Sequence, residues 1–93
     1  MIRTFKSKEV EQIFKRYYVK KYPYSIQRIA FRKLRMINKA ISINDLRVPP
    51  ANHLEKLKGD RTGQYSIRIN DQWRICFEWH SSDAFKVEIV DYH

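Results

Sequence analysis

Three stretches of alternating apolar and polar residues, joined by very short links, fill the C-terminal part of this sequence. They are QYSIRI (64–69), WRICFEW (73–79) and AFKVEIVDY (84–92), and such alternation is typical of β-strands with one buried face. Links this short allow only antiparallel neighbours. HLEKL (53–57), closed by the turn KGDRTG (58–63), adds a shorter strand. The sequence therefore predicts a four-stranded, mainly antiparallel C-terminal sheet.

The alternation also assigns each side chain of these strands to a face. One face is apolar and should pack against the rest of the chain; it holds Tyr65, Ile67, Ile69, Trp73, Ile75, Phe77, Trp79, Phe85, Val87 and Ile89. The opposite face, which we call the open face, carries Ser66, Arg68, Arg74, Cys76, Glu78, Lys86, Glu88 and, at the end of the last strand, Tyr92. Any chemistry of the sheet should lie on the open face.

The first half of the chain is predicted to cover the apolar face. Residues 1–5 alternate as a short strand, and apolar residues recur at helical spacing over 8–19 and 25–40. The turn-rich segment 42–52 contains two adjacent prolines and should form a loop or a single helical turn. Because a chain this short closes one core, residues 1–93 should form a single α+β domain.

Charge is distributed very unevenly along the chain. The net charge is +9; residues 1–40 hold 12 Lys and Arg against 2 Glu, whereas residues 41–93 hold 7 against 8 acidic residues. A basic surface of this density attracts phosphate backbones or, by the same field, acidic proteins and membranes. It could also be a solvated face that favours solubility. We favour nucleic acid, and the helical residues predicted to contact RNA are Lys15, Arg16, Lys20, Lys21, Arg28, Arg32 and Arg35.

Some functions are disfavoured by what the sequence lacks. The start, MIRTFKSKEVEQIF, is charged throughout, and no apolar run approaches the roughly 20 residues of a spanning helix, so we expect neither a signal peptide nor a membrane span. The single cysteine, Cys76, cannot form an internal disulfide and offers no metal-binding pair. We therefore expect a cytoplasmic protein without a metal or cofactor.

A group of reactive side chains lies on or beside the open face. The turn contributes Lys58, a central strand contributes Arg74, and the sequence ends on Asp91, Tyr92 and His93. Cleavage of RNA by its own 2′-hydroxyl needs a base, cations for the phosphorane oxygens and an acid for the departing 5′-oxygen, but no metal. Histidine or a carboxylate can transfer the protons, lysine and arginine can hold the phosphate, and tyrosine can stack on a base.

Each of these residues also has a purely structural interpretation. Arg74 could pair across the sheet with Glu78 or Glu88, Lys58 could belong to an ordinary hairpin turn, and His93 could simply be a terminal residue. Residue types alone leave both interpretations open.

Longer segments of the sequence resemble a known family. LKGDRTGQYSIRINDQWRICFEW (57–79), VEIVDYH (87–93) and LRVPPANHLEKL (46–57) resemble the HigB-type toxins of the RelE/ParE superfamily, from bacterial type II toxin–antitoxin modules. The resemblance implies a small RelE-like fold with an N-terminal strand, two helices and a C-terminal sheet. It also implies a ribosome-dependent endoribonuclease that cuts mRNA as it is translated and halts growth.

The resemblance assigns roles to individual residues. Lys58 matches the family's turn lysine, Arg74 its sheet arginine, and Asp91, Tyr92 and His93 its terminal catalytic residues.

Arg61 and Arg68 are predicted as further RNA contacts, and one nearby position departs from the family pattern. Many relatives carry a histidine three residues before the turn lysine, where this chain has Glu55. His53 lies two positions earlier and would share the strand face of Glu55 if the strand extends that far. A carboxylate at this position would weaken the attraction for phosphate.

The resemblance also implies partners. They are a HigA-like helix-turn-helix antitoxin, the ribosome and mRNA, with operator DNA bound only through the antitoxin and no membrane involved. Two other functions remain open: a non-catalytic inhibitor on the same scaffold, directed at DNA gyrase as in the ParE branch, and a basic RNA-binding module. The terminal acid–base groups argue against the inhibitor, because a blocking protein needs none.

Overall fold

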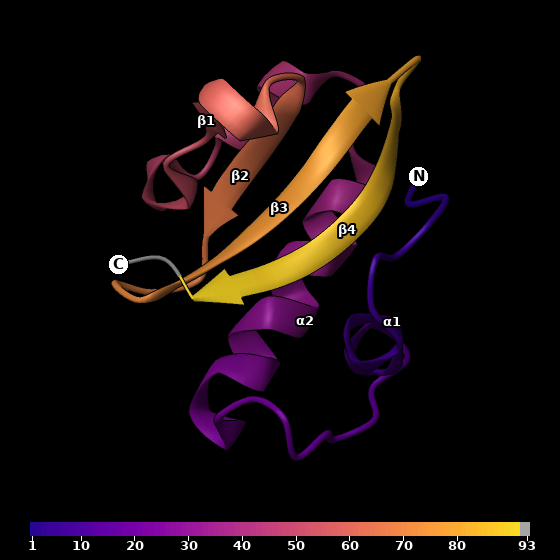
Figure 1. Cartoon of the computed structure of the whole chain (residues 1–93), viewed down its shortest axis with the longest axis vertical. Coiled ribbons are helices and arrows are strands. Elements are labelled where there is room, and N and C mark those ends of the chain that lie inside the picture. Colours follow the sequence, from indigo (N-terminus) through magenta and orange to yellow (C-terminus); the bar gives the residue numbers. More distant parts are fainter. Residues whose placement is uncertain (92–93) are drawn as a thin grey trace.

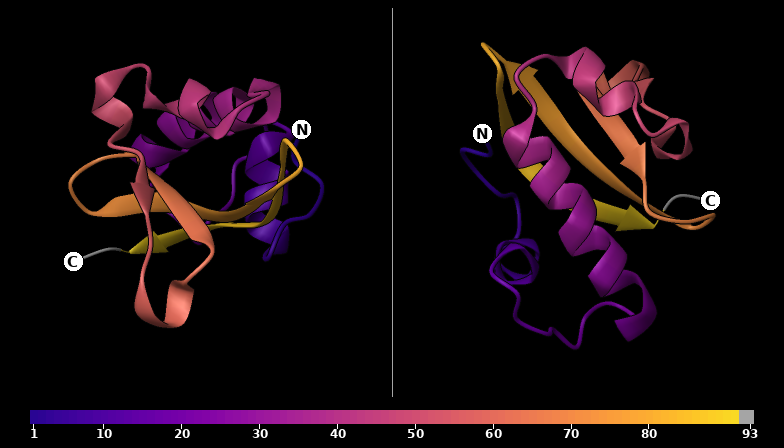
Figure 2. Two further views of the ribbon diagram at one scale, coloured as in Figure 1. Left: turned by 90° about the horizontal axis from the view of Figure 1, so that it is seen from above. Right: turned by 180° about the vertical axis from the view of Figure 1, so that it is seen from behind.

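The computed structural model describes residues 1–91. It contains a four-stranded antiparallel sheet with two helices packed against it (Figure 1). The strands follow chain order in the sheet: β1 Glu55–Lys56, β2 Gln64–Arg68, β3 Trp73–His80 and β4 Asp83–Asp91. The helices are α1 Lys8–Phe14 and α2 Tyr24–Lys39, and short 3-10 turns lie at Ile43–Arg47, Pro50–Asn52 and Gly59–Arg61. Figure 2 shows α2 crossing one face of the sheet with α1 beside it. The predicted α+β fold class is confirmed.

The apolar face predicted from the alternation forms the core with the helices. Its buried members are Ile67, Ile69, Ile75, Phe77, Val87 and Ile89, and the buried apolar stripe of α2 consists of Ile26, Ala30, Leu34 and Ile37. Burial of each large apolar side chain stabilises the fold by roughly 1.5–3 kcal/mol. The packing of α2 on the sheet therefore leaves the opposite, open face for other contacts.

One residue assigned to the apolar face lies on the other side. Phe85 pairs with Glu78, whereas Cys76, two residues earlier in β3, pairs with Glu88, three residues later in β4, so β4 contains an extra residue at this point. Such a bulge reverses the alternation, because a strand's side chains change face at every residue. Ala84, which is fully buried, takes the core position instead. The prediction for Phe85 was wrong because the bulge depends on pairing with β3, which alternation cannot reveal.

The same bulge interrupts the pairing of β4 with the N-terminal segment, which was predicted as a strand. Ile2 and Phe5 form isolated parallel bridges with Ala84 and Val87 of β4, on either side of the bulge. Between these bridges Lys86 has φ +53°, and its N–H donates to a threonine hydroxyl of the N-terminal segment rather than to its backbone. The segment therefore runs along β4 without forming a continuous strand.

The first helix is shorter than predicted: α1 ends at Phe14 instead of continuing to about residue 19. Arg16 adopts φ +71°; its N–H donates to the Ile13 carbonyl and the next N–H donates to the Gln12 carbonyl, both at 2.9 Å. This is a Schellman ending with arginine where glycine is usual. The aromatic and β-branched residues that follow are weak helix formers, which favours an ending here.

Gln27 on α2 holds the extended link between the two helices. Its buried side chain accepts a hydrogen bond from the Val19 N–H at 3.0 Å. Its amide nitrogen donates to the carbonyls of Val19 at 2.6 Å and Tyr22 at 2.8 Å. Backbone groups of the link are therefore hydrogen-bonded to a side chain instead of to other backbone groups, as they would be in a helix.

The segment before β1 is more structured than the predicted loop or single helical turn. Its two 3-10 turns end at Asn52, which is fully buried, and His53 has φ +45°. Because left-handed backbone cannot continue a strand, β1 begins only at Glu55. The predicted strand start at residue 53 was therefore wrong, and His53 does not share a strand face with Glu55.

We predict that Gln27→Leu lowers the free energy of unfolding by about 2–4 kcal/mol, because the buried backbone groups of Val19 and Tyr22 lose their partners. Urea unfolding followed by circular dichroism measures the change. Gln12→Leu is the matched control, since its side-chain amide makes no hydrogen bond within residues 1–91. Equal stability of the two variants would contradict the prediction.

Candidate functional site

Arg74 is a largely buried charged group on the open face. Its side chain comes from β3 and is only 11% exposed. Its Nε donates to the Ser66 hydroxyl at 2.9 Å, and its Nη2 donates to the His53 carbonyl at 2.6 Å. A carboxylate oxygen of Glu55 lies 3.5 Å from Nη2. These contacts orient the guanidinium, which lowers the entropic cost of receiving an anion.

The strand register explains why these groups meet. Glu55, Ser66, Cys76 and Glu88 are direct cross-strand partners and form one row on the open face. Arg74 lies in the next row and reaches Ser66 diagonally. Cys76 and Ser66 are fully buried under this face. Burial raises the pKa of the Cys76 thiol to about 11.

A second arginine, Arg61, forms an ion pair on the open face. It extends from the 3-10 turn between β1 and β2, and its Nη1 donates to Glu88 and Gln64, both at 3.1 Å. Lys6 approaches the same Glu88 carboxylate at 3.4 Å. Glu88 thus pairs with residues other than its row neighbours.

Lys58 lies in the turn that carries Arg61. It is exposed and immediately precedes the Gly59–Arg61 helical turn, whose first residue has φ +68°. The hairpin is closed by the Leu57 N–H, which donates to the Gln64 carbonyl at 2.8 Å. The β1–β2 connection therefore presents two predicted phosphate-binding residues together.

Asp91 ends β4 at the same end of the sheet as Arg74 but on the other face. Asp91 pairs with Trp73, whereas Val90 pairs with Arg74. The Asp91 carboxylate accepts a hydrogen bond from Gln72 Nε2 at 3.1 Å. The other two predicted terminal residues, Tyr92 and His93, lie outside the described residues.

A polar cleft adjoins Arg74. It has a volume of about 230 Å³ and is lined by His53, Arg68, Asn70, Asp71 and Arg74. Arg68, a predicted RNA contact, forms an ion pair with Asp71 across the β2–β3 turn. Within residues 1–91, no group of three or more His, Cys, Asp or Glu side chains is arranged to hold a metal ion. Cationic and amide groups of this kind suit an anionic or hydrogen-bonding ligand.

The remaining predicted RNA contacts lie on the helices and their link, away from the open face. Lys15, Arg16, Lys20, Lys21, Arg28, Arg32 and Arg35 are all exposed. No acidic residue occurs between Glu11 and Asp45; Glu11 forms an ion pair with Lys15 at 3.5 Å, and the rest of this surface is positive with little acidic compensation. No helix in the described part of the chain has both the length and the apolar character needed to span a membrane.

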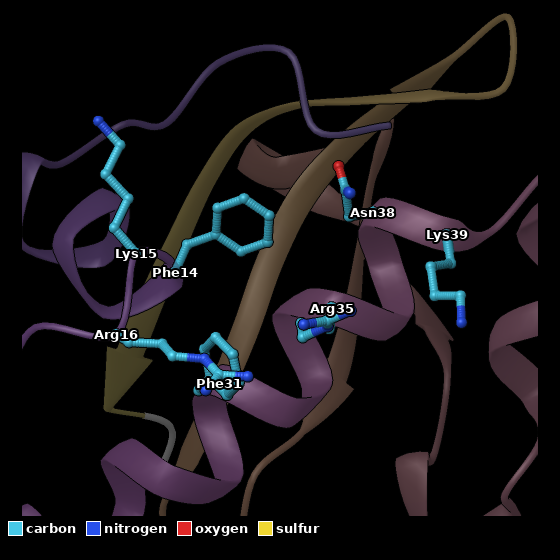
Figure 3. A pocket seen from close by; sticks show the side chains of 7 residues that line it. All are labelled: Phe14, Lys15, Arg16, Phe31, Arg35, Asn38 and Lys39. Atoms are coloured by element: carbon cyan, nitrogen blue, oxygen red, sulfur yellow. The ribbon is translucent and has the colours of Figure 1, made fainter.

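Two hollows between α1 and α2 form what we call the helix-side groove. The first, of about 410 Å³, is lined by Phe14, Lys15, Arg16, Phe31, Arg35, Asn38 and Lys39 (Figure 3). The second, of about 260 Å³, shares Arg16 and Phe31 with it and adds three tyrosines and Arg28. The guanidinium carbons of Arg16 and Arg35 lie 4.8 and 5.9 Å from the centre of the Phe31 ring. Cations combined with aromatic rings can bind phosphates and stack on bases.

Reasoning from the sequence missed part of the site. It treated Glu55 as a departure and gave no role to Ser66 or to the carbonyl of His53, yet these groups surround Arg74. The pairing of the short strand with 64–68 could have indicated Glu55, because it places Glu55 opposite Ser66. The left-handed turn at His53 leaves no comparable signal.

The fold is shared with solved structures of other proteins. A chain of the YoeB-YefM complex from Staphylococcus aureus matches with a TM-score of 0.58 and 20% identity, over 100% of this chain and 98% of that one. A mutant of YafQ from E. coli matches with a TM-score of 0.60 and 16% identity, over 98% of this chain and 91% of that one. At these identities the likeness defines the class of fold.

Sequence comparison identifies the family within this class. The chain belongs to the family described as RelE-like toxin of type II toxin-antitoxin system HigB, whose model matches residues 3–93. It is 42% identical over 82 residues to Toxin HigB-1 of Vibrio cholerae serotype O1, covering 85% of this chain and 84% of that protein. It is 35% identical over 94 residues to Endoribonuclease HigB of Proteus vulgaris, covering 100% of both. The family predicted from the sequence is thus confirmed, and with it an antitoxin partner.

We predict that Cys76 reacts with iodoacetamide at pH 8 about 100-fold more slowly in the native protein than in urea. Burial raises its pKa to about 11, so the reactive thiolate is scarce at this pH and forms only as the pH approaches that value. Mass spectrometry of timed samples measures the rate, and Cys76→Ala provides the unreactive control. Equal rates with and without urea would show that the thiol is accessible.

Proposed function

We propose that this toxin is an endoribonuclease that cuts mRNA by attack of a 2′-hydroxyl on the adjacent phosphate, without a metal. Membership of the toxin family and full-length similarity to a relative named an endoribonuclease support the activity. The observation that carries the mechanism is the guanidinium of Arg74, held by Ser66 and His53 beside a polar cleft.

Cations of the open face stabilise the charge that develops on the phosphate. The guanidinium of Arg74, already oriented by Ser66 and His53, contacts the phosphorane oxygens and shares its pair with Glu55 when the phosphate arrives. Lys58 and Arg61, in the β1–β2 connection, hold the neighbouring phosphates. The ion pair of Arg61 with Glu88 must open for this contact.

Glu55 is proposed as the general base. Its carboxylate lies 3.5 Å from Arg74 and its side chain is 54% exposed, so it adjoins the phosphate position and is accessible to substrate. A carboxylate there can take the 2′-hydroxyl proton, a role that offsets the weaker attraction for phosphate. Asp91, which together with His93 was a candidate base from the sequence, lies on the opposite face of the sheet by strand register.

The C-terminal residues complete the proposed reaction. His93 protonates the departing 5′-oxygen, Tyr92 stacks on a base or bonds a phosphate oxygen, and Asp91 orients its neighbours. These roles rest on the family resemblance.

The helix-side groove and the basic residues around it are proposed to contact ribosomal RNA. Their charge has little acidic compensation and suits a phosphate backbone, and their location leaves the open face to the mRNA. The toxin then acts in the cytoplasm on translated mRNA. A HigA-like helix-turn-helix antitoxin neutralises it and binds operator DNA.

We predict that Arg74→Ala and Glu55→Gln each reduce RNA cleavage by about 100-fold or more, because one removes phosphorane stabilisation and the other the base. Mapping of RNA 5′ ends after induction measures cleavage within translated frames. Arg47→Ala and Glu9→Gln are matched controls with the same charge changes elsewhere on the surface.

Two outcomes would contradict this assignment. Undiminished cutting in Arg74→Ala would exclude the site. Relaxed or tangled plasmid DNA without RNA cuts would instead favour a gyrase-directed inhibitor, and normal growth during overexpression would favour a simple RNA-binding module.

We predict that Arg28→Ala/Arg35→Ala weakens ribosome binding and reduces its dependence on salt, because two phosphate contacts are lost. Arg16 is left intact because its backbone is left-handed. Co-sedimentation with ribosomes at increasing salt measures binding. Arg3→Ala/Arg47→Ala removes the same charge outside the groove, so equal weakening by both pairs would indicate a non-specific effect of net charge.

A further inference from the structure

Lys33 is buried, unlike the other basic residues of α2. It is 6% exposed, whereas Arg28, Arg32, Arg35 and Lys39 are exposed. Its ammonium donates to the side-chain oxygen of Asn52, and no carboxylate pairs with it within residues 1–91. Desolvation, followed by the charge of Arg32, lowers the pKa of Lys33. A buried cation held by a neutral amide is costly for stability alone, since an apolar residue would avoid the desolvation.

Asn52 fixes the segment between α2 and β1 from the inside. It is fully buried, and its amide nitrogen donates to the carbonyl of Leu46 at 3.1 Å and to that of Val48 at 3.5 Å. Its oxygen receives the ammonium of Lys33. The two 3-10 turns are therefore tied to each other and to α2 through one side chain.

The next residue of this segment contacts Arg74. The Asn52 N–H donates to the Pro49 carbonyl at 2.9 Å, and the His53 N–H donates to the Pro50 carbonyl at 3.0 Å. Directly after this tight turn, the His53 carbonyl accepts a hydrogen bond from Arg74 Nη2 at 2.6 Å. A continuous series of contacts thus joins α2 to the guanidinium across the fold.

We propose that Lys33 and Asn52 are positioning residues that set the orientation of the Arg74 guanidinium through the His53 carbonyl. The proposal rests on the proposed role of Arg74 in cleavage. Fixing the turn fixes the carbonyl, and the carbonyl together with Ser66 selects the direction in which the guanidinium faces the substrate. A small displacement of such a group is costly for catalysis, since reacting groups must be placed to within a fraction of an ångström.

The geometry is tested directly by NMR of the Arg74 Nε–H, which the Ser66 hydroxyl protects from exchange with solvent. In Lys33→Met, which keeps the apolar stem but loses the ammonium, the signal should shift and its exchange with water should accelerate roughly tenfold or more. Lys8→Met removes the same charge from an exposed position and should leave the signal unchanged. Identical Arg74 signals in both variants would overturn the proposal.

Cleavage of ribosome-bound mRNA supplies the functional test. Lys33→Met should lower kcat roughly tenfold with little change in KM. In an Arg74→Lys background, which keeps charge but loses the fork, Lys33→Met should have no further effect. Additive losses would indicate a merely structural role and overturn the proposal, whereas recovery of activity by Lys33→Arg would support it.

Two arrangements keep the tests decisive. If Lys33→Met does not fold, Asn52→Asp takes its place, because it retains the partner of Lys33 but loses the donations to Leu46 and Val48. If Arg74→Lys cleaves as fast as the wild type, the proposed function fails, while the NMR signal still decides whether Lys33 and Asn52 position Arg74.

Discussion

The central strand β3 has one face in the core and the other on the open face, and the rest of the structure depends on this division. One face contributes Ile75 and Phe77 to the core under α2, and the other contributes Arg74 and Cys76 to the open face. Because β3 is paired on both sides, its backbone is held in place, and the position of Arg74 is fixed with it. A site built on such a strand is held more precisely than one built on a loop.

Positive charge has a different character on the two sides of the molecule. On the helices, apart from the buried Lys33, it is exposed and has few acidic neighbours, which favours long-range attraction and counterion release. On the open face, Arg61 and Arg74 each meet a carboxylate, from Glu88 and Glu55. Such pairs orient the guanidinium groups and must be opened or shared when a phosphate arrives. The helix surface is therefore suited to attracting a polyanion, and the open face is suited to catalysis.

Much of the fold could be predicted from the sequence because the signals were local. Alternation located β2 and β3 almost to the residue, and helical spacing located α2. Predictions failed where distant segments decide the outcome. The bulge that turns Phe85 away from the core exists only in the pairing with β3, and α1 ends early where Gln27 of the second helix binds the following link.

The sequence by itself determined that Arg74 lies opposite the core, because side chains of a strand alternate with a fixed period. It also determined that the helical half is basic. Only the tertiary structure decided that Glu55, Ser66 and the His53 carbonyl surround Arg74, and that Lys33 is buried against Asn52. The reason is that alternation follows from the geometry of one chain segment, whereas the neighbours of a side chain depend on register and on turns between segments.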